Sequence, residues 1–323
     1  MRVRSALLGF ASVLLLVPAL LLTTARLIEP DGVRWVQVQA FTPLALVPYA
    51  VLLAGALVAL GRRRGRSGPG LVTAVVALAG LGLHGWWFAP LVTGANPPAA
   101  DGAPTLTVMT ANLTRGEGDG TGLVQAASEA GADVLVVQEI TPAALAGMRR
   151  AGLDDLFSHR AGRPEQGVRG TMVFARAPLG RPTPVPAAFA SFALTVGDLR
   201  LLAVHPHSPL DVALWRRDHA ALRAAIADRT PDLVVGDFNA TPDHAPMRAL
   251  ADAGYRDVAE LANEGWQPTW PAHGRYRVLG VPLPRFASID HVLVGERLAA
   301  LRSSTVDLAG TDHRPVVAEV ARK

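Results

Sequence analysis

The segment Leu233-Val234-Val235-Gly236-Asp237-Phe238-Asn239 indicates how the soluble part of this chain folds. Its apolar, largely β-branched run predicts a buried strand, and two polar residues follow it at alternate positions. Side chains alternate between the faces of an extended chain, so Asp237 and Asn239 point one way and Phe238 points the other. A carboxylate and an amide at the end of a buried strand predict a functional site, because a core rarely accommodates both. The alternative for these two residues is a simple Asx-type turn.

Similar polar residues stand beside apolar runs throughout residues 105–323. They end or interrupt strands that we expect at 106–111, 133–137, 199–204 and 288–294, or they precede a last strand at 314–320. In chain order they are Asn112, Glu139, His205, Asp290, Asp312 and His313. Taken singly, most of these residues could be an ordinary turn residue, helix cap or solvated strand end. Because so many occur in about 200 residues, we expect them to have a common cause.

The expected elements favour two packed sheets over a parallel doubly wound sheet. Strands outnumber helices, short turns such as Gly197-Asp198 join several of them, and the helices at 123–130, 142–150 and 210–228 come in two batches. The Gly-rich loop 116–122 lacks the Gly-Lys-Ser/Thr ending of a phosphate loop, which argues against a nucleotide-binding site.

The first hundred residues differ in kind from the rest. Three apolar segments, at about 5–24, 41–60 and 71–92, are each long enough to span a bilayer. The first could instead be a signal peptide, but two further spans would follow it. Arg2, Arg4 and the cluster Arg62–Arg66 place the N-terminus and the loop between spans two and three in the cytoplasm. We therefore predict a linker at 93–104 and an extracytoplasmic domain at 105–323.

Composition narrows the function classes further. The 323 residues include no Cys, which excludes disulfides and thiolate-bound zinc. Residues 1–100 hold eight Arg and two acids, a formal +6, and the remaining 23 basic and 25 acidic residues give −2, which together make the net +4. The soluble part thus has no basic excess of the kind that drives sequence-independent nucleic-acid binding. With no acid or Lys in the apolar spans, a transporter or channel is a poor interpretation.

The order of the motifs resembles the endonuclease/exonuclease/phosphatase superfamily, which includes DNase I, abasic-site endonucleases, inositol-polyphosphate 5-phosphatases and neutral sphingomyelinases. The resemblance covers roughly residues 104–321. Its matching pieces are Asn112-Leu113, Gln138-Glu139, His205, Gly236-Asp237-Phe238-Asn239, Ile289-Asp290-His291-Val292-Leu293-Val294 and Asp312-His313-Arg314-Pro315. It implies an α/β fold, the four-layered DNase I-like sandwich, here preceded by three transmembrane helices. It also implies hydrolysis of a phosphate ester with a divalent ion, usually Mg²⁺, with Mn²⁺ also suitable.

The resemblance assigns roles that agree with the chemistry of the side chains. Metal ligands would be Asn112, Glu139 and Asp312, whose hard oxygen atoms suit Mg²⁺. The catalytic residues would be His205, Asp237, Asn239, Asp290 and His313. Asp290 would orient His313 and favour its charged form, and Asp237 would align or deprotonate the attacking water, with Asn239 holding that water or a phosphate oxygen. His205 would donate to another phosphate oxygen.

Other residues carry weaker expectations. Arg275 and Arg277, in the Pro-rich region 267–287, would meet a phosphate or a lipid headgroup, or be solvated loop charges. His207 competes with His205 for the catalytic position, and His291 is expected to pack, because the family commonly has an aromatic residue there. His84 is expected to be interfacial or hydrogen-bonded rather than a ligand. The remaining histidines are expected at the surface: His159, His219, His244 and His273.

Two functional hypotheses follow from the sequence. The first is a membrane-tethered, metal-dependent phosphoesterase acting on nucleic acid, on a phospholipid or on another small phosphodiester, with no protein partner implied. The near-neutral domain and the tether favour the lipid or small-molecule substrates, whereas the frequency of nucleases in the family favours nucleic acid. The second hypothesis is a non-catalytic, membrane-anchored binding module that keeps the fold. Such a module would be expected to lack site residues, and none is missing here.

Overall fold

The computed structural model describes residues 2–62, 68–94 and 96–323, with side chains from Phe10 onward. The chain forms two compact units, Met1–Pro90 and Leu91–Lys323. The Arg cluster at 63–66 and the side chains of Arg2 and Arg4 lie outside the described residues. These are most of the charges from which the membrane topology was predicted.

The first unit is helical and contains three stretches long and apolar enough to cross a membrane: Phe10–Ile28, Thr42–Arg62 and Gly68–Phe88. Its elements are α1 (Arg2–Ile28), α2 (Val33–Gln39), the 3₁₀ helix η1 (Thr42–Ala45), α3 (Leu46–Arg62) and α4 (Gly68–Phe88). The last helix ends at Phe88 instead of continuing to Val92, where the third apolar segment ends. A short helix, α5 (Pro90–Thr93), follows it, and Pro90 at its start has no N–H with which to continue α4.

Polar side chains and a glycine join these helices. Thr23 Oγ1 lies 2.8 Å from Tyr49 Oη and 2.9 Å from His84 Nε2, while His84 Nδ1 lies 3.2 Å from the Thr42 carbonyl oxygen. A Cβ at Gly80 would lie 2.4 Å from the Tyr49 ring, so only glycine allows α3 and α4 to approach this closely. His84 is therefore a buried, hydrogen-bonded residue that helps to hold the helices together.

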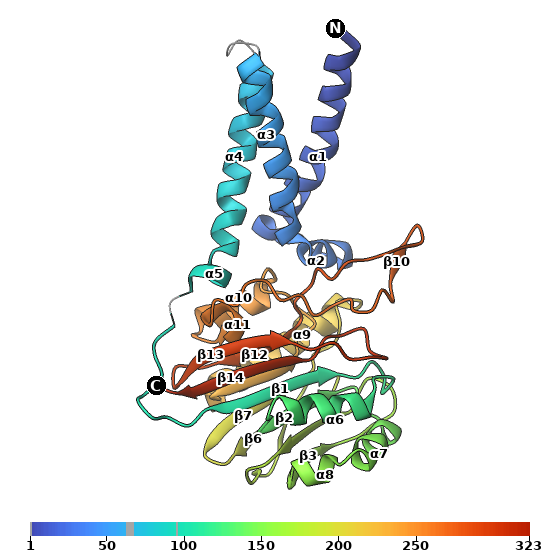
Figure 1. Ribbon diagram of the computed structural model, residues 1–323, viewed down its shortest axis with the longest axis vertical. Helices are drawn as coiled ribbons and strands as arrows, with labels where there is room; N and C mark the ends of the chain where they lie inside the picture. Colours follow the sequence, from blue (N-terminus) through green and yellow to red (C-terminus); the bar gives the residue numbers. More distant parts are fainter. Residues whose placement is uncertain (1, 63–67, 95) are drawn as a thin grey trace. The chain divides into compact units, whose positions relative to one another are not determined.

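The second unit contains two six-stranded sheets (Figure 1). Sheet 1 has the order β13 (Leu298–Thr305), β14 (Val316–Arg322), β1 (Leu106–Asn112), β2 (Val134–Gln138), β4 (Thr171–Ala175) and β3 (His159–Arg163). Sheet 2 has the order β5 (Thr183–Val185), β6 (Ser191–Val196), β7 (Leu199–Val204), β8 (Leu233–Asp237), β12 (Asp290–Val294) and β9 (Arg256–Asp257).

Alternation along the strands separates two hydrophobic cores. In β2, Val134 and Val136 belong to the core between the sheets, together with Leu201 and Val235 of sheet 2. Their neighbours Leu135 and Val137 face the other way and pack in a second core with residues of the covering helices. A strand that is apolar on both faces is buried on both, which is why these strands read as continuous apolar runs.

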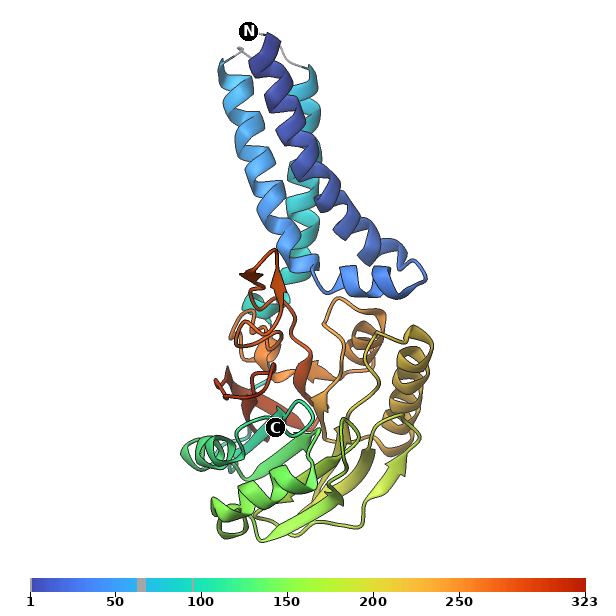
Figure 2. The same cartoon turned by 90° about the vertical axis from the view of Figure 1, so that its right-hand side faces the viewer.

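Helices cover the outer face of each sheet and complete four layers (Figures 1 and 2). Over sheet 1 lie α6 (Gly120–Glu129) and α7 (Pro142–Arg150), followed by the short α8 (Leu153–Leu156). Over sheet 2 lies the long helix α9 (Val212–Arg229), followed by α10 (Ala245–Asp252), and α11 (Val258–Leu261) follows β9. Asp119, Thr141 and Asp211 cap the helices α6, α7 and α9, each accepting a backbone N–H of the first turn.

Several features differ from the expectations. Edge strands β3, β5 and β9 and the hairpin of β10 (Arg277–Val278) with β11 (Val281–Pro282) have no counterpart in the sequence reading. The prediction that His219 and His244 lie at the surface was wrong, since both are buried. Both rings pack edge-on against Trp215, at ring-centroid distances of 4.8 and 5.5 Å. The face of α9 that carries Trp215 and His219 is therefore the buried one.

Candidate active site

Sheet topology brings the predicted residues to one edge of each sheet. The strands β1 and β2 are parallel, with Asn112 opposite Gln138, so Asn112 and Glu139 emerge at the same edge. The antiparallel partner β14 begins there, which places Asp312 and His313 just ahead of its first residue.

The same logic holds in sheet 2. The strands β7 and β8 are parallel, with Val204 opposite Gly236, so His205 and Asp237 follow at one edge. Asp290 begins the antiparallel β12 directly opposite Asp237.

Gly236 is required by the close approach of these strands. Its φ of +149° lies in the region that favours glycine, and a Cβ there would lie 2.1 Å from the Val204 carbonyl oxygen. The glycine of the opening motif is therefore explained by backbone packing next to the site.

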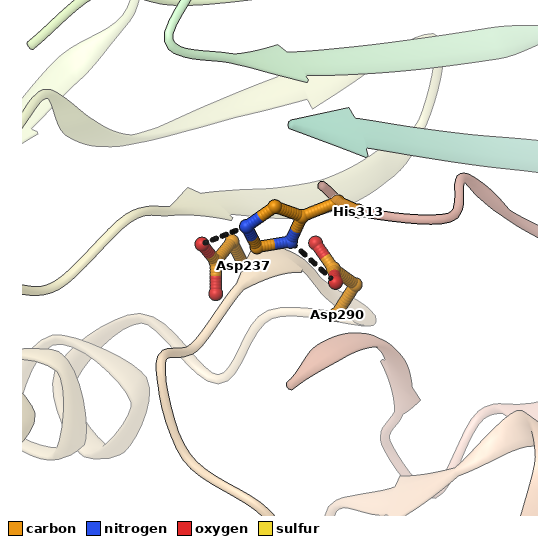
Figure 3. Close-up of side chains that lie close together, drawn as sticks. All are labelled: Asp237, Asp290 and His313. Atoms are coloured by element: carbon orange, nitrogen blue, oxygen red, sulfur yellow. Dashed lines mark hydrogen bonds and ion pairs between the residues drawn. The ribbon is translucent and has the colours of Figure 1, made fainter. Parts of the chain in front are cut away.

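His313 lies between two carboxylates (Figure 3). Its Nδ1 is 2.9 Å from Asp290 Oδ2, and its Nε2 is 4.0 Å from Asp237 Oδ2 and 3.9 Å from Asp312 Oδ1. Burial lowers the pKa of the His313 ring, but the charge and hydrogen bond of Asp290, with Asp237 and Asp312 nearby, outweigh it and raise the pKa to about 10. The ring is therefore an imidazolium at neutral pH, oriented by Asp290.

Asp237 is held as a buried hydrogen-bond acceptor. It accepts from Asn112 Nδ2 at 2.9 Å and from the Asn239 backbone N–H at 2.7 Å. Burial, with the neighbouring charge of Asp290, raises the pKa of Asp237 to about 7, against the influence of His313 and of these two donors. A carboxylate that titrates near neutrality suits a group that takes up or orients the proton of a water molecule.

Asn239 is fixed by several contacts. Its Nδ2 donates to the Pro206 carbonyl oxygen at 3.1 Å, and its own carbonyl oxygen accepts from Trp215 Nε1 at 2.9 Å. Its φ of +49° is left-handed, a conformation that Asn tolerates better than most residues. Asn239 thus lies beside Asp237 through an Asx-type turn, in which its N–H donates to Asp237 Oδ1, and not through the alternation of an extended strand, because β8 ends at Asp237.

His205 is buried and neutral. Burial, with the charges of His313 and His207, lowers the pKa of His205 to about 3. Its Nε2 lies 3.8 Å from Asp237 Oδ2 and 3.9 Å from Glu139 Oε1, and its Nδ1 has no hydrogen-bond partner among the residues that the structure describes. His205 is buried, whereas His207 is only half-buried and its Nδ1 lies 2.8 Å from the Ser208 carbonyl oxygen.

Glu139 has an unusual environment for an acid. Burial raises the pKa of its carboxyl group, although the Arg115 backbone N–H at 2.6 Å and Asn112 Nδ2 at 3.2 Å act in the opposite direction. Three residues here have left-handed backbones, Thr114, Arg115 and Glu139, with φ between 45° and 58°. Such backbone strain gathers where a particular arrangement of groups is held.

Asp312 is surrounded by neutral donors. It accepts from Tyr276 Oη at 3.0 Å, from Trp270 Nε1 at 3.2 Å and from the Thr114 hydroxyl. Burial alone would raise its pKa, but His313 and these donors lower it, so the carboxylate is ionised. The sequence reading missed these donors. Trp270 and Tyr276 lie in the Pro-rich region 267–287, where no motif marks them as partners of Asp312.

The donor set fits a divalent cation. Four carboxylates converge here, at Glu139, Asp237, Asp290 and Asp312, and their only cationic hydrogen-bond partner among the described contacts is His313. The Asp290 Oδ1 atom is buried without a partner among the described residues. Such an excess of hard oxygen atoms over positive charge is what Mg²⁺ or Mn²⁺ requires.

Two groups of residues compete for that cation. The ligand atoms of Asp237, Asp290 and His313 lie within 4.8 Å of one another, close enough to share a metal ion. A charged imidazole has no free lone pair, however, and His313 is charged here. Glu139, Asp312 and the Asn112 amide form the second group, and the Asn112 oxygen has one lone pair left beside its bond from the Thr114 N–H at 2.9 Å.

The remaining predicted residues lie at the rim or outside. Arg275 pairs with Glu117 at 2.7 Å, and Arg277 donates to the Gly280 carbonyl oxygen at 3.0 Å. His291 does more than pack: its Nδ1 lies 2.5 Å from Asp257 Oδ2 and its Nε2 lies 3.0 Å from the Ala240 carbonyl oxygen. Because both nitrogens face acceptors, the His291 ring carries both protons and forms a second imidazolium–carboxylate pair with the half-buried Asp257.

Comparison with known proteins supports the fold and the family resemblance. Residues 109–313 match the sequence model of the Endonuclease/Exonuclease/phosphatase family. A search among curated proteins found no match.

Solved structures share the fold of the second unit. An endonuclease/exonuclease/phosphatase family protein from Bacteroides thetaiotaomicron is 14% identical, with a TM-score of 0.52 over 68% of this chain and 99% of that one. A 3′ phosphatase, NExo from Neisseria, solved with a product DNA hairpin, is 18% identical, with a TM-score of 0.52 over 66% and 98%. TDP2 from D. rerio, solved with a single-strand DNA product, is 16% identical, with a TM-score of 0.52 over 67% and 98%. These likenesses confirm the predicted four-layered fold.

Proposed function

The chain belongs to the Endonuclease/Exonuclease/phosphatase family, and from this premise we propose that it is a membrane-anchored hydrolase that cleaves a phosphate ester with a divalent cation. The family consists of divalent-metal-dependent hydrolases that act on phosphoester bonds. The observation that carries the proposal is the position of His313, an imidazolium placed by Asp290 beside Asp237 and the oxygen ligands of the same sheet edge.

Glu139, Asp312 and Asn112 would hold the cation, which is Mg²⁺ or Mn²⁺. When bound, the cation polarises the phosphoryl oxygen and stabilises charge on the leaving oxygen. Tyr276 and Trp270 would fix the Asp312 carboxylate in one orientation, in the way that groups behind a metal ligand commonly do. The raised pKa of Glu139 supports this assignment, since burial disfavours its carboxylate form and a bound cation would stabilise that form.

The chain's own residues would divide the chemistry as follows. Asp237 aligns a water molecule and receives its proton, and Asn239 holds that water or a phosphate oxygen. His313, positively charged, donates from Nε2 to a phosphate oxygen as negative charge develops there. The neutral His205 ring donates one N–H to another phosphate oxygen. The attack would be in line with the leaving oxygen, as phosphoryl transfer requires.

The substrate is a phosphate ester of nucleic acid, of a phospholipid or of a small diester. The DNA products bound in the Neisseria and D. rerio structures belong to those proteins and favour nucleic acid by analogy. The near-neutral charge of residues 101–323 and the apolar helices favour a lipid or small substrate.

Turnover is tested with the full chain in lipid nanodiscs. Plasmid DNA, bis-p-nitrophenyl phosphate and sphingomyelin are offered with Mg²⁺, and the Asp237→Ala variant serves as the control. We expect metal-dependent turnover of at least one substrate by the native protein and none by the variant. No turnover of any of them would favour the non-catalytic binding module.

Location has a separate test. We propose that the protein is a multi-pass protein of the cell membrane with a cytoplasmic N-terminus and an extracytoplasmic catalytic unit. A reporter enzyme that is active only outside the cytoplasm, fused after Lys323, should then be active. Activity of a cytoplasm-specific reporter at the same position would overturn the orientation.

A further inference from the structure

The hairpin of β10 and β11 exposes apolar side chains at its tip. Leu279 is 99% exposed, and its neighbours Val281 and Val278 are 66% and 55% exposed. Figures 1 and 2 show that this hairpin projects away from the two sheets of the catalytic unit. A short segment that places three adjacent aliphatic side chains in water is costly unless another surface covers it.

The base of the hairpin is attached to the candidate active site. Tyr276 Oη donates to Asp312, and the Tyr276 ring lies 5.1 Å from the Trp270 ring, centroid to centroid. The Leu283 N–H closes the base by donating to the Tyr276 carbonyl oxygen at 2.8 Å. The base of the hairpin therefore contacts a proposed metal ligand directly.

The chemistry of the hairpin indicates the kind of surface. Its tip is aliphatic, so it offers no ring on which a nucleic-acid base would stack. Arg277 lies in the same hairpin and donates only to the Gly280 carbonyl oxygen among its described contacts, which leaves its charge uncompensated by any described acid. An apolar tip with a cation beside it is the pattern of segments that lie in the interface of a bilayer.

The catalytic unit follows the third candidate membrane helix directly in the chain. The third candidate membrane helix ends at Phe88, and only three residues later the Leu91 carbonyl oxygen accepts from the Gly265 N–H at 3.0 Å. Three residues span about 10 Å at most. Gly265 also begins the segment that leads through Trp270 to the hairpin. The segment that carries the hairpin therefore starts at a residue bonded to the chain just after the third membrane helix.

We propose that residues 275–283 form a membrane-contact hairpin, whose tip at Val278, Leu279 and Val281 enters the headgroup region of an anionic lipid bilayer. The occupant is the surface of the membrane in which the chain is anchored, so the proposal rests on that anchoring but not on hydrolysis. The ligand that the proposal assigns to this hairpin is a lipid surface.

The test uses the absence of Cys from the native chain, which allows a single label. The full-length Leu279→Cys variant is labelled with a polarity-sensitive fluorophore and reconstituted in phosphatidylcholine–phosphatidylglycerol vesicles. Some vesicles carry lipids with a nitroxide quencher on the acyl chain. The matched control is Leu210→Cys, because Leu210 is also a highly exposed leucine of the catalytic unit but lies outside the hairpin. A Val281→Cys variant guards against a local effect of the label at 279.

We expect the labels at positions 279 and 281 to shift to shorter emission wavelengths and to lose fluorescence to the nitroxide, while the label at 210 does neither. Replacing phosphatidylglycerol with phosphatidylcholine should weaken the quenching, because Arg277 then has no anionic headgroup to meet. Equal, unquenched signals at all three positions would overturn the proposal. A response to an added oligonucleotide, but not to the nitroxide, would assign the hairpin to nucleic acid instead. Flotation of the vesicles reports the anchoring separately, and failure to float would also contradict the proposal.

Discussion

Replacing Asp290 by Asn tests how the site keeps the His313 ring positively charged. The amide keeps the size of the carboxylate and can still accept from His313 Nδ1, so the substitution removes charge without removing the hydrogen bond. The distance between His313 Nδ1 and Asp290 Oδ2 is 2.9 Å, and both side chains are buried. At an effective dielectric constant of about 20, such a pair attracts by about 6 kcal/mol, enough to move a pKa by about four. This agrees with the pKa of about 10 that the structure gives His313.

The expected loss of activity follows from that pKa. Without the charge of Asp290, the pKa of His313 falls toward its ordinary value of about 6.5, because burial lowers it and only the more distant Asp237 and Asp312 still raise it. At a pKa of about 6.5, only about one ring in thirty would be charged at pH 8, so the loss of charge should lower kcat by up to about thirtyfold.

The assay needs a control for stability, and the protein contains one. His291 and Asp257 form a second imidazole–carboxylate pair in the same sheet, and neither side chain makes a described hydrogen bond to the carboxylates of the site. We expect Asp290→Asn and Asp257→Asn to lower the melting temperature alike, whereas only Asp290→Asn lowers kcat against a soluble phosphodiester. The reasoning would be refuted if Asp290→Asn kept kcat within about threefold of the native value, or if both variants lost activity equally.

Three further predictions concern the same site. Because the pKa of Asp237 is raised to about 7 and that of His313 to about 10, kcat/KM should rise with pH through about 7 as Asp237 ionises and fall only above about 10; a profile flat between pH 5 and 9 would contradict these assignments. Tyr276→Phe removes a hydrogen bond to Asp312, so the Mg²⁺ concentration for half-maximal activity should rise by about tenfold with a smaller change in kcat; an unchanged titration would show that Tyr276 does not support a metal ligand. Chelation with EDTA should abolish turnover, and Mg²⁺ or Mn²⁺ should restore it in the native protein but not in Glu139→Gln; full activity in EDTA would rule out the metal.

Much of the fold and of the candidate site could be predicted because both depend on local patterns. Apolar runs that end in Asn112, Glu139 or Asp237, or that begin at Asp290, are visible in the sequence, and parallel or antiparallel pairing then decides at which edge the polar residues meet. The topology itself came from the family resemblance, since alternation alone does not say which strands pair.

The surroundings of the site could not be predicted in the same way. Tyr276 reaches Asp312 from a loop 36 positions away, and neither periodicity nor a turn signal records such a contact. The burial of His219 was available but overlooked: Trp215, His219, Leu222 and Ile226 recur at helical spacing and form the buried face of α9. A histidine on such a stripe belongs to the packed face even though its type suggests the surface.

The central claim is that oxygen atoms from separate strand ends enclose one cation beside the His313–Asp290 pair. Anomalous diffraction from crystals of the full chain containing Mn²⁺ tests this most directly. We predict one strong anomalous peak about 2.0–2.3 Å from a carboxylate oxygen of Glu139, with Asp312 and Asn112 completing the protein ligands. A peak coordinated by Asp237, Asp290 and His313 instead, or no peak at this edge of the sheets, would contradict the account.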